Sequence, residues 1–108
     1  MEHKYTFNPS TRYITKGISE LVPFEIQLFM WSEIDKLVRT TDTLDYLQVF
    51  EFKMKDMYIE LEHRQEVPEY KKIHKLKLVG EYRVLDKLKI FVIDDSPSHS
   101  TMLLASEY

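Results

Sequence analysis

Residues 46–63 read YLQVFEFKMKDMYIELEH, and this stretch sets the fold class. Its first part, Tyr46–Phe52, is rich in the aromatic and branched residues that favour β-strands. Apolar and polar side chains then alternate over Met57–His63, which is the pattern of a strand with one buried face. The four residues Lys53–Asp56 lie between the two runs and are few enough to form a hairpin turn. The stretch therefore predicts two antiparallel strands.

Around this hairpin the sequence predicts one long helix and several further strands. Pro23 suits the first turn of a helix, and the helix is expected to end near Thr40, where the following residues are poor helix formers. The other predicted strands are Arg12–Thr15, Ile73–Val79, Leu88–Asp94 and Thr101–Ala105, the last with a short helix as its alternative. Residues 1–11 are expected to be a loose lead-in. We therefore predict a single domain over residues 1–108, of the α+β class, with a mostly antiparallel sheet of five or six strands and one long helix packed on one face.

Composition excludes several classes of protein. The chain has 108 residues, a net charge of −3 and 44% hydrophobic residues, which is ordinary for a soluble globular domain. It has no cysteine, so disulfides, thiolate nucleophiles and cysteine-based metal sites are excluded. Its two glycines cannot build a phosphate-binding loop of the Walker or dinucleotide type, because such loops need several glycines. No cofactor is predicted.

The same survey bears on the cellular setting. The N-terminus has no apolar segment of the signal-peptide kind. The longest strongly apolar stretch is Leu28–Trp31, whereas a membrane-spanning helix needs about 20 apolar residues. We therefore expect a cytoplasmic protein that does not enter a membrane.

The charges are segregated along the chain. Residues 56–69 carry a net charge of −4 and residues 71–89 a net charge of +5. An antiparallel pair folded about Pro68 sets the acidic strand against the basic one, with His63 predicted opposite His74. The lysines then need no nucleic acid to explain them, and the sequence pI of 5.8 also disfavours a nucleic-acid binder. Binding of nucleic acid through residues 71–89 is kept as an alternative.

Two groups of residues have the composition of a chemical site. His63, His74 and Glu66 supply two imidazoles and a carboxylate, which are ligands for zinc or another divalent metal. Their spacing is wider than that of recognised metal motifs, and two partly buried histidines at a strand end are the simpler interpretation. The alternative function that they suggest is a metal-binding protein or a small metal-dependent hydrolase.

The second group is Asp94, Asp95 and His99, which follow the most strongly predicted strand. Aspartates at the end of a strand are placed for metal or acid–base chemistry, but they are also ordinary turn residues. The sequence does not choose between these two interpretations.

The predicted helix has an unusually wide apolar arc. Its apolar residues cover roughly 200° when plotted at 100° per residue, about twice the usual minimum for an amphipathic helix. Either the N-terminal strand and the C-terminal segment cover the excess, or a second molecule does. The second case predicts a homodimer or a groove for a protein partner, with Phe29, Met30 and Trp31 as anchors.

Several separated phrases are shared with a known family. They are RYITKGI (12–18), DYLQVF (45–50), HRQEVPEY (63–70), IFVIDD (90–95) and HSTMLLASEY (99–108). Through them the chain resembles, over residues 12–108, the family of short Firmicutes and phage proteins catalogued as domain of unknown function 960. The resemblance implies a cytosolic bacterial or phage setting and brings no activity and no catalytic residues. The leading interpretation is a non-catalytic accessory or protein-interaction module rather than an enzyme.

Overall fold

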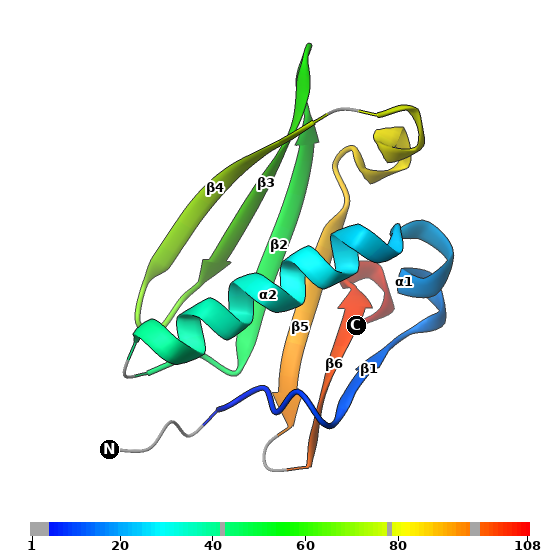
Figure 1. The fold of residues 1–108 in the computed structure, drawn as a ribbon. Coiled ribbons are helices and arrows are strands. Elements are labelled where there is room, and N and C mark those ends of the chain that lie inside the picture. Colours follow the sequence, from blue (N-terminus) through cyan, green and yellow to red (C-terminus); the bar gives the residue numbers. More distant parts are fainter. Residues whose placement is uncertain (1–4, 42, 78, 96–97) are drawn as a thin grey trace.

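The computed structural model describes residues 5–41, 43–77, 79–95 and 98–108. A six-stranded sheet forms one layer, and a long helix crosses one of its faces to form the second (Figure 1). The elements in chain order are β1 (Arg12–Ile14), α1 (Lys16–Leu21), α2 (Phe24–Thr40), β2 (Leu47–Met54), β3 (Tyr58–Gln65), β4 (Tyr70–Lys77), the 3-10 turn η1 (Gly80–Leu85), β5 (Lys89–Asp95), β6 (His99–Leu104) and the 3-10 turn η2 (Ala105–Glu107). The predicted α+β class is confirmed.

The strand order in the sheet is β1-β6-β5-β2-β3-β4. All neighbouring pairs are antiparallel except β1 and β6, which run parallel, so the sheet is mixed. The parallel pair joins the first and the last strand in the sequence, and both helices and the other four strands lie between them along the chain. The sheet is therefore mostly antiparallel, as the sequence predicts, and β1–β6 is its parallel pair.

The strands β3 and β4 pair as predicted, but their register is different. His74 lies opposite Leu61 and His63 lies opposite Lys72, so the predicted pairing of His63 with His74 is wrong by two residues. The reason is that the turn takes only residues 66–69, which is a tighter connection than the prediction assumed. A shift of two residues keeps every side chain on its predicted face. The carboxylates of β3 therefore still share a face with three lysines of β4, although only Glu60 lies directly opposite one of them, Lys75.

The helix α2 begins and ends as predicted, and it buries its sheet-facing side. Its buried residues are Ile26, Gln27, Met30, Trp31, Glu33, Ile34 and Leu37. Two other residues of the predicted arc, Phe24 and Leu28, are exposed by 67% and 52% respectively. The apolar arc is therefore only partly covered within the monomer.

The N-terminal segment supplies part of that cover. Phe7 is fully buried in the core, and its backbone N–H donates to Asp94 Oδ2 at 3.1 Å. The Arg12 guanidinium lies 4.6 Å from the centre of the Trp31 ring and pairs with the Asp35 carboxylate. The prediction of a loose lead-in over residues 1–11 is thus wrong for Phe7, while residues 1–4 lie outside the described part of the chain.

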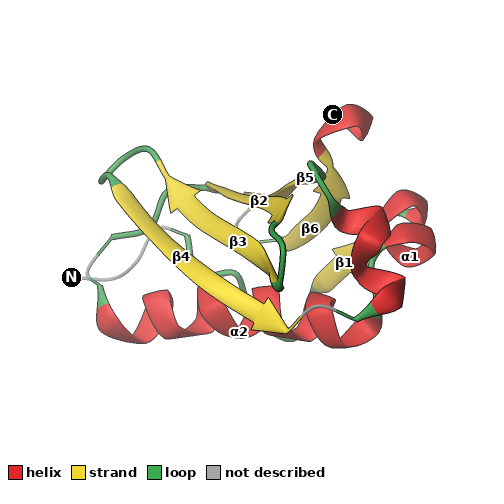
Figure 2. Ribbon diagram, turned by 90° about the horizontal axis from the view of Figure 1, so that it is seen from above, coloured by secondary structure: helices red, strands yellow, loops and turns green. Residues whose placement is uncertain are grey.

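In the described part of the chain, the opposite face of the sheet is largely uncovered. Viewed from above, α2 runs along one side of the sheet, and the short C-terminal η2 lies at one edge of the other side (Figure 2). Among the described residues, no helix is both long and apolar enough to cross a membrane.

Candidate functional site

An apolar cluster lies on the uncovered face of the sheet. Successive side chains of a strand point to opposite faces, so residues paired across strands share a face. Val49 lies opposite Phe91, which in turn lies opposite Leu103, and Leu47 lies opposite Ile93. These five residues, here called the apolar patch, span β2, β5 and β6. Val49 is 8% exposed and the other four are partly exposed.

Aromatic residues lie beside the apolar patch. The Tyr108 ring contacts the Phe91 ring edge-on, with 5.7 Å between ring centres, and Tyr108 is 79% exposed. On β1, Tyr13 pairs with Thr101 on the same face and is 58% exposed. Exposed tyrosines that combine an apolar ring with a hydroxyl are common at protein interfaces.

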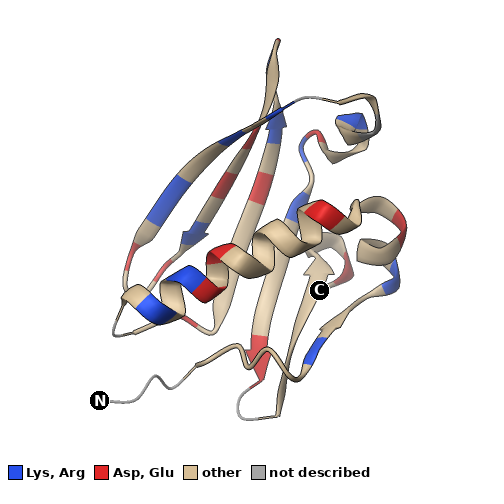
Figure 3. Cartoon of the chain, viewed as in Figure 1, with Lys and Arg blue, Asp and Glu red and all other residues tan. Residues whose placement is uncertain are grey.

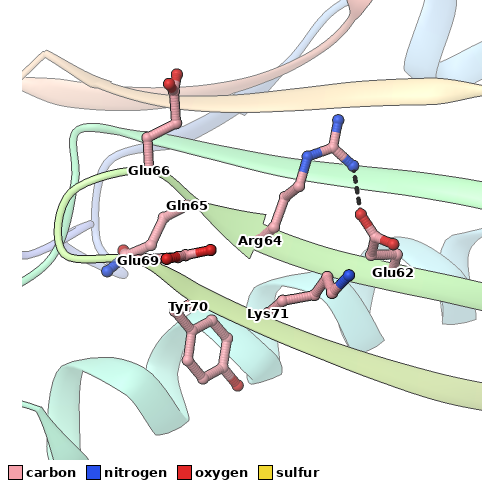
Figure 4. Close-up of a pocket in the computed structure, with 7 residues that line it drawn as sticks. All are labelled: Glu62, Arg64, Gln65, Glu66, Glu69, Tyr70 and Lys71. Atoms are coloured by element: carbon pink, nitrogen blue, oxygen red, sulfur yellow. Dashed lines mark hydrogen bonds and ion pairs between the residues drawn. The ribbon is translucent and has the colours of Figure 1, made fainter.

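Two adjoining hollows lie where the apolar patch meets the β3–β4 turn. The first, of about 370 Å³, is lined by Leu47, Val49, Arg64, Gln65, Glu66, Lys89 and Phe91. The second, of about 420 Å³, is lined by Glu62, Arg64, Gln65, Glu66, Glu69, Tyr70 and Lys71 (Figure 4). The first hollow therefore combines the apolar side chains of Leu47, Val49 and Phe91 with charged and polar groups. The second is lined mainly by charged and polar groups.

Arg64 lines both hollows and is held in place by two carboxylates. Its Nη1 donates to Glu51 Oε1 at 2.9 Å and to Glu62 Oε2 at 2.6 Å. Burial by itself lowers the pKa of Arg64, but the hydrogen bonds and charges of Glu51 and Glu62 outweigh it and raise that pKa. Arg64 is thus a charged side chain whose guanidinium is held by carboxylates, and its contact with Glu62 is drawn in Figure 4.

A chain of polar side chains lies on the other face, under α2. His63 is fully buried, and its Nε2 lies 2.7 Å from Gln48 Oε1. Because Gln48 Nε2 donates to Gln65 Oε1 at 2.7 Å, Gln48 Oε1 is the acceptor and His63 Nε2 carries the proton. His63 Nδ1 is buried, and no group of the described residues forms a hydrogen bond with it. Burial lowers the pKa of His63 to about 4, so the imidazole is neutral at pH 7.

A buried ionic group lies next to this chain. The side chain of Glu33 is 2% exposed, accepts a hydrogen bond from Lys36 Nζ at 2.8 Å, and lies 3.1 Å from His74 Nε2. Burial raises the pKa of Glu33, but Lys36 and His74 outweigh it, so that the pKa is lowered. The pKa of His74 is lowered mainly by burial. The ring of Phe29 meets that of His74 edge-on at 5.0 Å. These contacts fasten α2 to β4.

The predicted metal ligands do not come together. His63 and His74 share the helix-facing side of the sheet, but Glu66 lies exposed in the turn and lines the hollows described above. Within the described ranges, no group of three or more histidine, aspartate and glutamate side chains is arranged to hold a metal ion. The structure thus gives no support to the predicted metal site.

The second predicted cluster is divided between the two faces of the sheet. Asp94 is buried and accepts the N–H of Phe7, whereas the side chain of Asp95 is 61% exposed. Asp95 Oδ2 lies 3.6 Å from His99 Nε2, and Ser98 Oγ lies 2.9 Å from His99 Nδ1. Asp94 therefore has a structural contact, and the remaining residues form a small exposed group beside the β5–β6 turn.

The residues predicted to anchor a partner are mostly internal. Met30 is fully buried and Trp31 is 9% exposed, and Phe29 packs partly buried against the core. These three residues stabilise the monomer, so the prediction that they form an interaction surface on α2 is wrong. The sequence does indicate the surface on the sheet. The runs LQVF (47–50) and IFVI (90–93) have apolar residues on both faces of their strands, so one apolar face is left over beyond the face that packs against the helix.

Comparisons with known proteins identify relatives but no activity. The profile of a family described as "Staphylococcal protein of unknown function (DUF960)" matches residues 11–107. No protein of curated function matches the chain. A crystal structure titled as a protein of unknown function from Enterococcus faecalis has a TM-score of 0.80 and 21% sequence identity, and the match covers 95% of each chain. At this identity the likeness shows a shared fold alone.

Proposed function

The chain belongs to the DUF960 family, whose description gives no function, and we propose that it is a non-catalytic accessory protein that binds a protein partner in the bacterial cytoplasm. The binding surface is the uncovered face of the sheet, centred on the apolar patch. This location replaces the face of α2 on which the sequence placed the surface.

The observation that carries the proposal is an apolar cluster beside a hollow on an otherwise uncovered sheet. Burial of apolar surface contributes about 25 cal/mol per Å², so a contiguous patch favours association. Arg64 is already occupied by Glu51 and Glu62, whereas Lys89 is exposed at the rim of the first hollow. The partner that fits is a protein segment with apolar side chains for the hollow and a carboxylate for Lys89.

A non-catalytic role agrees with the contacts of the buried ionisable side chains. The buried carboxylates of Glu33 and Asp94 bind Lys36 and the backbone of Phe7, respectively. Fully buried His63 has its Nε2 bound to an amide oxygen. These groups are thus engaged in contacts that hold the fold.

The proposal is tested by capture with matched variants. Phe91→Asp places a charge in the middle of the apolar patch, and Met57→Asp changes an exposed apolar residue outside it, 84% exposed in the β2–β3 turn. The wild type and both variants, each checked for folding by thermal denaturation, are used to capture proteins from a staphylococcal lysate.

We expect one protein to be retained by the wild type and by Met57→Asp and to be lost with Phe91→Asp. Retention by all three, or by none, contradicts the proposal. A wild type that is dimeric in light scattering, together with a monomeric Phe91→Asp, identifies a second copy of the chain as the occupant instead.

A further inference from the structure

We propose that the free edge of β4 accepts an extended, acidic segment of the partner as a seventh strand of the sheet. The inference rests on the proposed function, because it takes the partner to be a protein, but it uses residues outside the apolar patch. It adds both a second contact surface and the chemical class of the segment that binds there.

The first support is the position of β4 in the sheet. All eight of its residues, Tyr70–Lys77, pair with β3. It is the last strand in the sheet order, so within the described chain its other edge has no strand neighbour (Figure 1). An edge strand directs half of its backbone N–H and C=O groups outward, where an added strand forms hydrogen bonds with them.

The second support is the charge along that edge. Its lysines are all exposed and lie along most of its length (Figure 3); they are Lys71, Lys72, Lys75 and Lys77. Lys71, Lys75 and Lys77 lie on the uncovered face, whereas Lys72 shares the helix-facing side with His63. Both faces of the edge are therefore cationic.

The inner neighbour of β4 shows which kind of strand it accepts. β3 carries Glu60 and Glu62 at alternating positions, and Glu60 lies directly opposite Lys75. Opposite charges paired across strands stabilise the pair, whereas like charges destabilise it. A strand with carboxylates at alternating positions, added to the outer edge, faces the lysines from the other side. Ile73, which is 48% exposed on the same face, adds an apolar contact.

The same lysines select against other strands. Lysine on an edge strand discourages pairing with neutral, aggregation-prone segments. Pairing of β4 with β4 of a second copy sets lysines against lysines, which is repulsive. Specificity for an acidic partner thus follows from the charges that block self-association.

The probe is an acetylated and amidated peptide of alternating glutamate and valine, about as long as the eight residues of β4. Its affinity is measured by titration calorimetry, and its position by amide hydrogen exchange. We expect binding, with new protection of amides in β4. We also expect no binding by the same peptide N-methylated at alternate residues, because that peptide cannot donate the hydrogen bonds of a strand pair.

Two double variants separate local charge from overall charge. Lys71→Glu with Lys77→Glu reverses two charges on β4, and Lys16→Glu with Lys87→Glu makes the same change in net charge at exposed positions elsewhere. We expect the first pair to weaken binding about tenfold or more and the second to change it by less than about twofold.

Equal binding of the N-methylated peptide, equal effects of the two double variants, or protection outside β4 overturns the inference. Tighter binding of a single-stranded oligonucleotide of equal charge assigns the edge to nucleic acid instead. Phe91→Asp is expected to leave the peptide affinity within about twofold, because Phe91 lies on β5 at a distance of three strands. Failure of the peptide test and failure of the capture test are therefore distinguishable.

Discussion

Acidification from pH 7 to pH 5 is expected to lower the free energy of unfolding by about 2 kcal/mol through His63 alone. In the folded protein burial holds the pKa of His63 at about 4, against an ordinary value of 6.5. The unfolded chain therefore takes up a proton as the pH falls below 6.5, while the folded protein does not. Stability is full above pH 6.5 and declines as the pH falls toward 4.

The magnitude follows from the two pKa values. At about 1.4 kcal/mol for each unit of pKa, the gap between 6.5 and about 4 corresponds to about 3.4 kcal/mol below pH 4. About 2 kcal/mol of this is lost by pH 5. His74 acts in the same direction, because burial lowers its pKa too. The pKa of Glu33 is also lowered, so protonation of Glu33 reduces the stability further as the pH falls below its ordinary pKa of 4.5.

The assay is urea denaturation at pH 7 and at pH 5 for the wild type, His63→Gln and His99→Gln. His99 lies half exposed at the start of β6 and serves as the control histidine. Each protein is compared with itself at the two pH values, so any loss of stability from the substitution itself cancels. We expect His63→Gln to lose about 2 kcal/mol less than the other two on acidification. An unchanged loss in His63→Gln, or an NMR titration of His63 near 6.5, refutes the reasoning.

Two further predictions concern packing and buried charge. Gly17→Ala is expected to cost about 1 kcal/mol or more in thermal denaturation, because the added methyl group lies 2.7 Å from a side-chain carbon of β6. Gly80→Ala is expected to be close to neutral, because no atom of the described residues lies within 4 Å of the added methyl group. Glu33→Ala is expected to cost about 2 kcal/mol in urea denaturation, since it removes the buried acceptor beside His74. Glu20→Ala, which breaks an exposed ion pair of 3.9 Å, is expected to cost less than about 0.5 kcal/mol, and equal losses at the two positions contradict this assignment.

The long elements were predictable because apolar residues recur along them at regular intervals. The spacing of apolar residues over 24–40 and the alternation over 57–63 each fix an element and its buried face. The register of β3 and β4 was not fixed by that pattern, because a shift by two residues leaves every side chain on its face. The length of the turn at 66–69 determines the register. That length could not be predicted, because the turn residues have no repeating pattern.

Short and single features escaped prediction because distant residues stabilise them. The six-residue helix α1 is held by Glu107, whose carboxylate accepts from the backbone N–H of Gly17 at 3.1 Å and from Thr15 Oγ1 at 2.6 Å. Phe7 and Tyr5 lie in a short, mostly polar segment without a repeating pattern. The backbone N–H of Phe7 donates to Asp94, which is far away in the sequence. The candidate surface on the sheet was missed for a related reason, since it forms only when β2, β5 and β6 lie side by side.

The parallel pairing of β1 with β6 has a consequence for biosynthesis. The ribosome makes β1 first among the strands, yet the strand beside it in the sheet is β6, the last to be made. A nascent chain that ends at β5 already contains β2–β5, which are mutual neighbours in the sheet. Residues 12–14 therefore have no strand partner until residues 99–104 have left the ribosome, and the edge formed by the first strand is the last part of the sheet to close.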